Sequence, residues 1–246
     1  MKLRRLLSLF ALALAMAFAP ALGAADPIRV ATDATFPPME FMKDGKRTGF
    51  DIELIEAMAR TIGRPVQWVD IDFKGLIPGL VANRFDVAAS AIYMTDERRK
   101  VVSFTDTYFA GGLVVVVRRD NKTIKTPQDL AGKKVSVQVG TKSVNFLKEN
   151  YPAVQRVEVE KNQEMFDLLL IGRVDAVVTG RPAAGEFARA RSNVRVLDQA
   201  LTTEHYGYAL RQDETALITQ MNQALQKLKA DGTYATLTNR WFGAAK

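Results

Sequence analysis

Short apolar runs alternate with amphipathic stretches along the chain from Asp26 onward. IRVAT at 28–32 and VQWVDI at 66–71 are typical of buried strands. Between them, the apolar positions of 50–62 fall on one face of a helix that ends at Gly63. A second helix is predicted around 76–81, and a small-residue strand at 86–91. Strands that alternate with helices predict parallel sheets covered by helices on both faces.

The same order restarts after the apolar run LVVVV at 113–117. Thr126, Pro127 and Asp129 are typical of a helix start. Three strands are predicted at 134–139, 157–160 and 174–179, and two helices alternate with them, one capped by Ser143 and one over 163–171. YGYALR at 206–211 predicts a returning strand, followed by helices over 214–230 and 233–241. The predicted fold class is therefore α/β, with two lobes.

Four loops follow the carboxyl ends of predicted strands. They are residues 33–36, 90–98, 140–143 and 179–182, two from each lobe. Ligands of open parallel α/β sheets bind outside the carboxyl ends of the strands. If the lobes face one another, all four loops line a single cleft.

The first 25 residues have the pattern of a secretory signal peptide. MKLRR precedes an uncharged run over 6–19, and small residues end at Ala25, where we predict cleavage. The alternative, a transmembrane anchor, needs about 20 apolar residues. We therefore predict a protein that is free in the periplasm, and the chain has no Cys that a lipid could modify.

Composition and charge narrow the possible functions. The 246 residues are 48% hydrophobic and contain no Cys, which excludes global disorder and a disulfide framework. The formal net charge is +7, but the basic residues are scattered among acids, and export makes nucleic acid a poor candidate partner. His205 is the only histidine, and neither a P-loop nor a metal-ligand cluster is present in the sequence. We expect no metal, no cofactor and no catalytic residues, although carboxylates alone can act as acid and base.

Anion binding has better candidates. In Thr95-Asp96-Glu97-Arg98, Thr95 is typical of an N-cap, and Arg98 in the first turn can reach back over the strand end to hold a carboxylate with its guanidinium. Residues 140–143 offer backbone N–H groups at a second helix start. The alternatives are a solvated Arg98 and ordinary helix capping.

The mature chain resembles the periplasmic polar-amino-acid-binding proteins of ABC importers, above all their glutamine-binding branch. The stretches that carry the resemblance include ATDATFPPMEF, GFDIELIEAMA, FDVAASAIYMTDERRK, DLAGKKVSVQVGTKS, GRVDAVVTGRP and DGTYATLTNRWFG. The resemblance implies a type II periplasmic-binding-protein fold with two hinge strands. Its first lobe would comprise 26–111 plus 206–246, and its second lobe 112–205.

The resemblance also implies the ligand contacts. Arg98 matches the arginine that binds the ligand carboxylate, and Phe73 would pack on the ligand side chain. The full set of implied contacts is Asp33, Phe36, Phe73, Ala91, Tyr93, Arg98, Gln138, Thr141, Lys142, Thr179, Gly180 and Arg181.

Two departures from the family pattern leave the solute open. Gly180 stands where the family has an aspartate that pairs with the ligand ammonium, and Tyr93 is bulkier than the usual Ser or Thr. Lys142 and Arg181 also add cations near the cleft. Because a buried ammonium without a counter-charge is costly, one hypothesis is a small organic anion without a free amine. The other is that Asp33 or backbone carbonyls bind the ammonium, and glutamine-like solutes bind as usual.

We therefore expect a non-enzymatic monomer that captures a small carboxylate-bearing solute between its lobes and delivers it to an inner-membrane permease. Two other hypotheses remain. One is a dehydratase-type enzyme that uses the same scaffold for a cyclic carboxylate, with Asp33 or Glu40 in its chemistry. The other is a sensory protein that acts on a receptor in trans.

Overall fold

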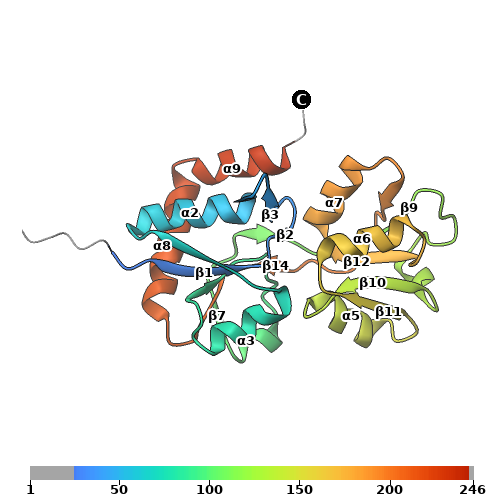
Figure 1. The fold of residues 1–246 in the computed structure, drawn as a ribbon, viewed down its shortest axis with the longest axis horizontal. Coiled ribbons are helices and arrows are strands. Elements are labelled where there is room, and N and C mark those ends of the chain that lie inside the picture. Colours follow the sequence, from blue (N-terminus) through green and yellow to red (C-terminus); the bar gives the residue numbers. More distant parts are fainter. Residues whose placement is uncertain (1–24, 244–246) are drawn as a thin grey trace, which may run out of the picture.

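The computed structural model describes residues 25–243, which form two lobes placed side by side (Figure 1). The predicted signal peptide lies outside the described residues, except for Ala25. Among residues 25–243, no helix combines the length and the apolarity that crossing a bilayer requires.

The first lobe is built around a five-stranded sheet with the order β5-β1-β6-β15-β7. β1 pairs in parallel with both β5 and β6, whereas β15 is antiparallel to β6 and β7. The strands are β1 (Ile28–Thr32), β5 (Val66–Asp70), β6 (Val87–Ala88), β7 (Ser103–Phe104) and β15 (Ala209–Leu210). A small antiparallel sheet of β2 (Thr35–Phe36), β3 (Glu40–Lys43) and β4 (Lys46–Thr48) extends from the end of β1.

The second lobe repeats this layout in the order β11-β10-β12-β9-β13. β10 is parallel to β11 and β12, and β9 is antiparallel to β12 and β13. The strands are β9 (Leu113–Arg118), β10 (Lys134–Gln138), β11 (Gln155–Val159), β12 (Ala176–Gly180) and β13 (Val194–Val196). β9 and β12 read as continuous apolar runs because both are buried along most of their length.

Two antiparallel strands connect the lobes. β8 (Phe109–Ala110) leads out of the first lobe and β14 (His205–Tyr206) leads back into it, and the two pair with each other. They lie between the lobes, where β14 is labelled in Figure 1. These are the two hinge strands of the fold.

Helices cover the sheets because each presents an apolar face to them. The helices and 3-10 turns of the first lobe are α2 (Phe50–Ile62), η2 (Phe73–Gly75), α3 (Leu76–Val81), α4 (Asp96–Arg99), α8 (Thr215–Ala230) and α9 (Thr233–Phe242). Those of the second lobe are η3 (Pro127–Leu130), α5 (Lys142–Asn150), α6 (Asn162–Leu170) and α7 (Arg181–Ala190). α2 has the predicted bounds, and it ends where Gly63 adopts a left-handed conformation with φ 81°.

Some local predictions were wrong. α5 begins one residue earlier than predicted, with Thr141 and not Ser143 at its N-cap position. The predicted strand 206–211 is split into the end of β14 and β15, because Gly207 lies against the Met94 side chain and hydrogen-bonds to Ile92 O. β2–β4, α7 and β13 carry no periodicity that the sequence analysis recognised.

Candidate functional site

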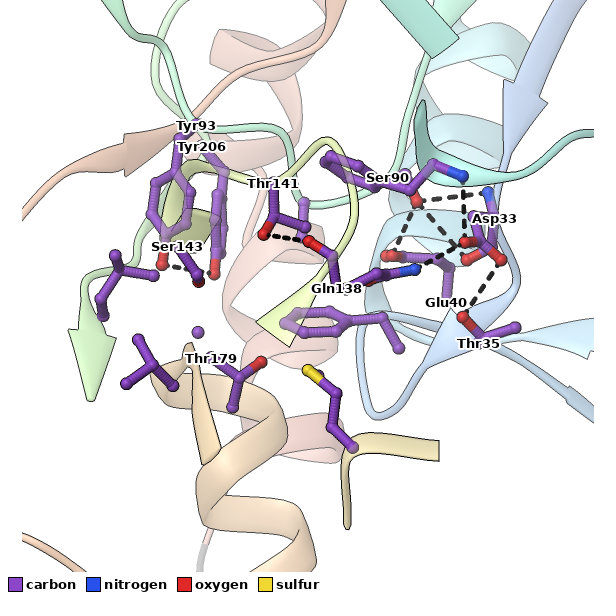
Figure 2. A pocket seen from close by; sticks show the side chains of 17 residues that line it. Asp33, Thr35, Glu40, Ser90, Tyr93, Gln138, Thr141, Ser143, Thr179 and Tyr206 are labelled. Carbon is purple, nitrogen blue, oxygen red and sulfur yellow. Dashed lines mark hydrogen bonds between the residues drawn. The ribbon is translucent and has the colours of Figure 1, made fainter. Parts of the chain in front are cut away.

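A cavity lies between the lobes, at the carboxyl ends of β1, β6, β10 and β12 (Figure 2). Its empty volume is about 450 Å³, and all four predicted loops contribute to its wall. The labelled side chains fall into two groups. We call Asp33, Thr35, Glu40 and Ser90 the acidic end, and Tyr93, Ser143, Thr179 and Tyr206 the hydroxyl end.

The structure brings most of the candidate contacts together. Nine of them line this cavity: Asp33, Phe36, Phe73, Ala91, Tyr93, Gln138, Thr141, Thr179 and Gly180. Arg98 and Lys142 line an adjoining groove between the lobes, which shares Phe73 and Thr141 with the cavity. Arg181 lines neither and is exposed.

Asp33 is buried at the acidic end and has a full set of hydrogen-bond donors. Its Oδ2 accepts from Phe73 N at 3.1 Å and from Gln138 Nε2 at 2.9 Å. Its Oδ1 accepts from Thr35 Oγ1 at 3.1 Å and lies 3.3 Å from Lys161 Nζ. Gln138 and Lys161 come from the second lobe, so Asp33 is a point where the closed lobes are joined.

Beneath the acidic end, two fully buried carboxyl groups face each other. Glu40 Oε1 accepts from Ser90 Oγ at 2.9 Å, and Asp51 Oδ2 accepts from Ala91 N at 3.0 Å and from Tyr108 Oη at 2.7 Å. Burial raises the pKa of Glu40 well above its usual range, and the neighbouring Asp51 charge raises it further. Glu40 therefore keeps its proton and shares it with Asp51.

The shared proton predicts an unusual pH dependence of stability. Burial also raises the pKa of Asp51 to about 7. Because the folded state holds a proton that the unfolded state releases near pH 4, the free energy of unfolding falls as pH rises through this interval. We expect Glu40→Gln to remove this slope. Wild type should lose about 1–3 kcal/mol relative to the variant between roughly pH 5 and 7, measured by urea denaturation. Parallel pH profiles would contradict a shared proton.

Arg98 lies in the adjoining groove at the start of α4. Thr95 is the N-cap, and its Oγ1 accepts from Arg98 N at 3.3 Å. The guanidinium donates to Tyr93 O at 2.9 Å and to Gly140 O of the second lobe at 3.2 Å, and its Cζ lies 5.6 Å from the centre of the Phe73 ring. Burial lowers the pKa of Arg98 to about 10, so it remains charged at neutral pH.

The guanidinium of Arg98 has no ion-pair partner within residues 25–243. Beside it, Thr141 Oγ1 donates to Gln138 O at 2.7 Å and makes no hydrogen bond that caps α5. The amino end of α5, with its positive dipole end, thus lies next to a desolvated cation. Both features favour an anion at this place.

The other two candidate cations are placed differently. Lys142 forms an ion pair with Glu204, just before hinge strand β14, so its charge is compensated inside the protein. Arg181 points away from both cavities, although its backbone N donates to Gly112 O at 2.9 Å. Neither side chain therefore adds the free positive charge at the cleft that the sequence suggested.

Sequence reasoning missed several residues of the cavity wall: Thr35, Leu113, Met165, Val178 and Tyr206, with Ser90 and Ser143 assigned only to loop and cap positions. Tyr206 reaches the cavity from a hinge strand, and nothing in its neighbouring sequence indicates this. Within the described chain, no group of three His, Asp or Glu side chains is arranged to hold a metal ion.

The geometry agrees with comparisons to known proteins. Residues 28–244 match the family of bacterial extracellular solute-binding proteins, family 3. The chain belongs to this family. Its curated relatives include ABC transporter arginine-binding protein 1 of Escherichia coli (strain K12), 32% identical over 236 residues, with 94% of this chain and 96% of the relative covered.

Solved structures of solute-binding proteins share the fold. An ancestral arginine-binding protein bound to arginine matches with a TM-score of 0.85 and 38% identity over 88% of this chain and 98% of that chain. An ancestral amino acid-binding protein, AncCDT-1, described as a precursor of cyclohexadienyl dehydratase, matches with a TM-score of 0.83 and 38% identity, covering 88% and 95%. Other relatives in the family are named for cystine and histidine. The glutamine-binding branch therefore stays a prediction.

Proposed function

We propose that this protein is the periplasmic component of an ABC importer, and that it captures a small carboxylate-bearing solute between its lobes and delivers it to an inner-membrane permease. The solute would be a polar amino acid such as glutamine or an amino-acid-like organic anion. The protein would act as a monomer, with 26–111 plus 206–246 as one lobe and 112–205 as the other.

One observation carries the carboxylate: Arg98 is a desolvated guanidinium in the groove between the lobes, without a carboxylate partner in the described chain. A charge in such a place is costly unless a ligand pairs with it. Its two acceptors are backbone carbonyls, one in each lobe, so a bound carboxylate replaces weaker contacts with a charge-assisted pair. The same carboxylate lies within reach of the amino end of α5.

Capture by lobe closure is supported by contacts that cross the cleft. Lys161 Nζ lies 2.6 Å from Asp72 Oδ1, and Lys74 Nζ lies 2.6 Å from Glu160 Oε1. Asn145 Nδ2 donates to Glu97 Oε2 at 3.1 Å. Each contact joins one lobe to the other near the mouth of the cleft, and each breaks when the lobes rotate apart on β8 and β14.

A thermal-shift panel tests the proposed function. It comprises polar amino acids, dicarboxylates and aromatic acids, each added to the mature protein. A solute present at 100 times its Kd adds about 2.7 kcal/mol of stability, which is a clear rise in Tm. We expect a rise with at least one carboxylate and none with the matching amide or ester. A rise with uncharged sugars alone would contradict the proposal.

An enzymatic function is a second candidate, because Glu40 lines the cavity and keeps a proton that it can donate. Such an acid suits the loss of water from a cyclic carboxylate. Incubating the protein with prephenate-like acids, and following product formation by absorbance, separates an enzyme from a binding protein.

A further inference from the structure

The hydroxyl end of the cavity contains a pair of tyrosines in direct contact. The rings of Tyr93 and Tyr206 lie 4.6 Å apart between centroids, and their hydroxyl oxygens are 3.1 Å apart (Figure 2). Both residues are buried, and Gly112 N donates to Tyr93 Oη at 3.1 Å. The backbone of the two tyrosines also forms a bridge where hinge strand β14 meets the first lobe, so the pair is fixed by the hinge itself.

The tyrosine hydroxyls fill the space in front of Gly180. A Cβ atom at position 180 would lie 2.5 Å from Tyr206 Oη, 3.0 Å from Phe36 Cζ and 3.3 Å from Tyr93 Oη. Position 180 is where the resemblance places an ammonium-binding aspartate. The sequence suggested that glycine leaves this position vacant, and the structure corrects that: two hydroxyl groups occupy it.

The hydrogen bonds of the pair leave one donor over. The two hydroxyls share one hydrogen bond, so one of their two protons is used between them. Tyr93 Oη is also an acceptor for Gly112 N–H. Burial raises the pKa of Tyr93 to about 12 and that of Tyr206 well above its usual range, so both protons stay in place at neutral pH. The second proton has no acceptor among the described residues and is available to a ligand.

The remainder of the cavity offers no free carboxylate to a ligand ammonium. Asp33 and Glu40 are the only acidic residues in the described wall. Four donors already surround Asp33, and Glu40 is neutral. An ammonium group at either end would therefore lose its hydration without gaining a counter-charge.

We propose that the Tyr93–Tyr206 pair, together with Gly180, makes the cleft select carboxylic acids whose α-substituent is a hydrogen-bond-accepting oxygen and not an ammonium. The ligand class is thus the 2-oxo or 2-hydroxy acids. Arg98 holds the carboxylate, and the spare tyrosine proton is donated to the neighbouring oxygen. This inference rests on the proposed function and names the solute class for the same site.

Matched ligand pairs test the inference by isothermal titration calorimetry on the mature protein. L-glutamate is compared with 2-oxoglutarate, L-phenylalanine with phenylpyruvate, and L-glutamine and L-arginine are included. We expect the better 2-oxo acid to bind at least 10-fold more tightly than its parent amino acid. Equal or tighter binding of the amino acids, with dependence on Arg98, overturns the inference and leaves the proposed function standing. If no carboxylate binds, both fall.

A double variant provides the reciprocal test. Tyr206→Phe removes the oxygen nearest to Gly180 and opens room for a side chain, so Tyr206→Phe/Gly180→Asp places a carboxylate where the hydroxyl was. We expect the preference to shift at least 10-fold toward the amino acid. Tyr206→Phe alone is the control: Tyr93 still supplies a donor, so the 2-oxo acid should remain preferred. Circular dichroism establishes that each variant is folded, and a failure of the double variant to fold leaves the wild-type comparison decisive. An unchanged preference in a folded double variant also overturns the inference.

Discussion

Arg98→Ala is expected to weaken binding of the tightest solute by about 3 kcal/mol, roughly 150-fold in Kd. The substitution removes the charged partner of the carboxylate, and the ligand anion would then be desolvated without compensation. Arg98→Lys keeps the charge but not the two-pronged geometry, so we expect an intermediate loss of about 10-fold. The measurement is calorimetric titration with the best solute of the panel.

Arg99→Ala is the matched control for this prediction. Arg99 is the next residue of α4, but it is exposed, and its Cζ lies 5.5 Å from the Phe104 ring, away from the cleft. Its removal should leave Kd within about twofold, since exposed charges interact weakly. The fold should tolerate Arg98→Ala, because the side chain's two acceptors are carbonyl groups and no carboxylate loses its partner. Unchanged affinity in Arg98→Ala would end the case for a carboxylate clamp.

Asp51→Ala is expected to destabilise the protein by about 3–5 kcal/mol. The Asp51 carboxylate is the acceptor for Ala91 N–H and Tyr108 O–H, and it shares the proton of Glu40. Alanine would leave these buried donors without a partner. Ala91 has φ 45°, in the left-handed region that non-glycine residues seldom adopt. Because Ala91 lines the cavity, losing its anchor also disturbs the ligand-facing backbone.

Two comparison variants make the Asp51 result specific, and urea denaturation measures all three. Asp51→Asn retains an acceptor oxygen for Ala91 and Tyr108, so we expect a loss of only about 1 kcal/mol. Glu53→Ala lies on the same helix, and Glu53 pairs with Arg240 at 2.6 Å near the surface. Its loss should cost at most about 1 kcal/mol. Equal effects for Asp51→Ala and Glu53→Ala would show that the buried hydrogen bonds contribute little.

The sequence by itself determined which segments become strands and helices. The apolar positions of 50–62 and the glycine that follows are local signals, and α2 has the predicted bounds. The continuous apolar run at 113–117 likewise became the buried strand β9. Strand ends of a parallel sheet share one edge, so the loops that reach the cavity were also predictable. These features depend on neighbours within a few residues.

Only the tertiary structure decided what the cavity offers a ligand. Tyr93 and Tyr206 are 113 residues apart in the chain, yet their hydroxyls fill the space at Gly180. Glu40 keeps its proton because folding buries it against Asp51, and Lys142 is neutralised by Glu204 across the hinge. Charge and hydrogen-bonding capacity depend on burial and on distant partners. Local patterns report neither, so the sequence placed the site, and packing set its chemistry.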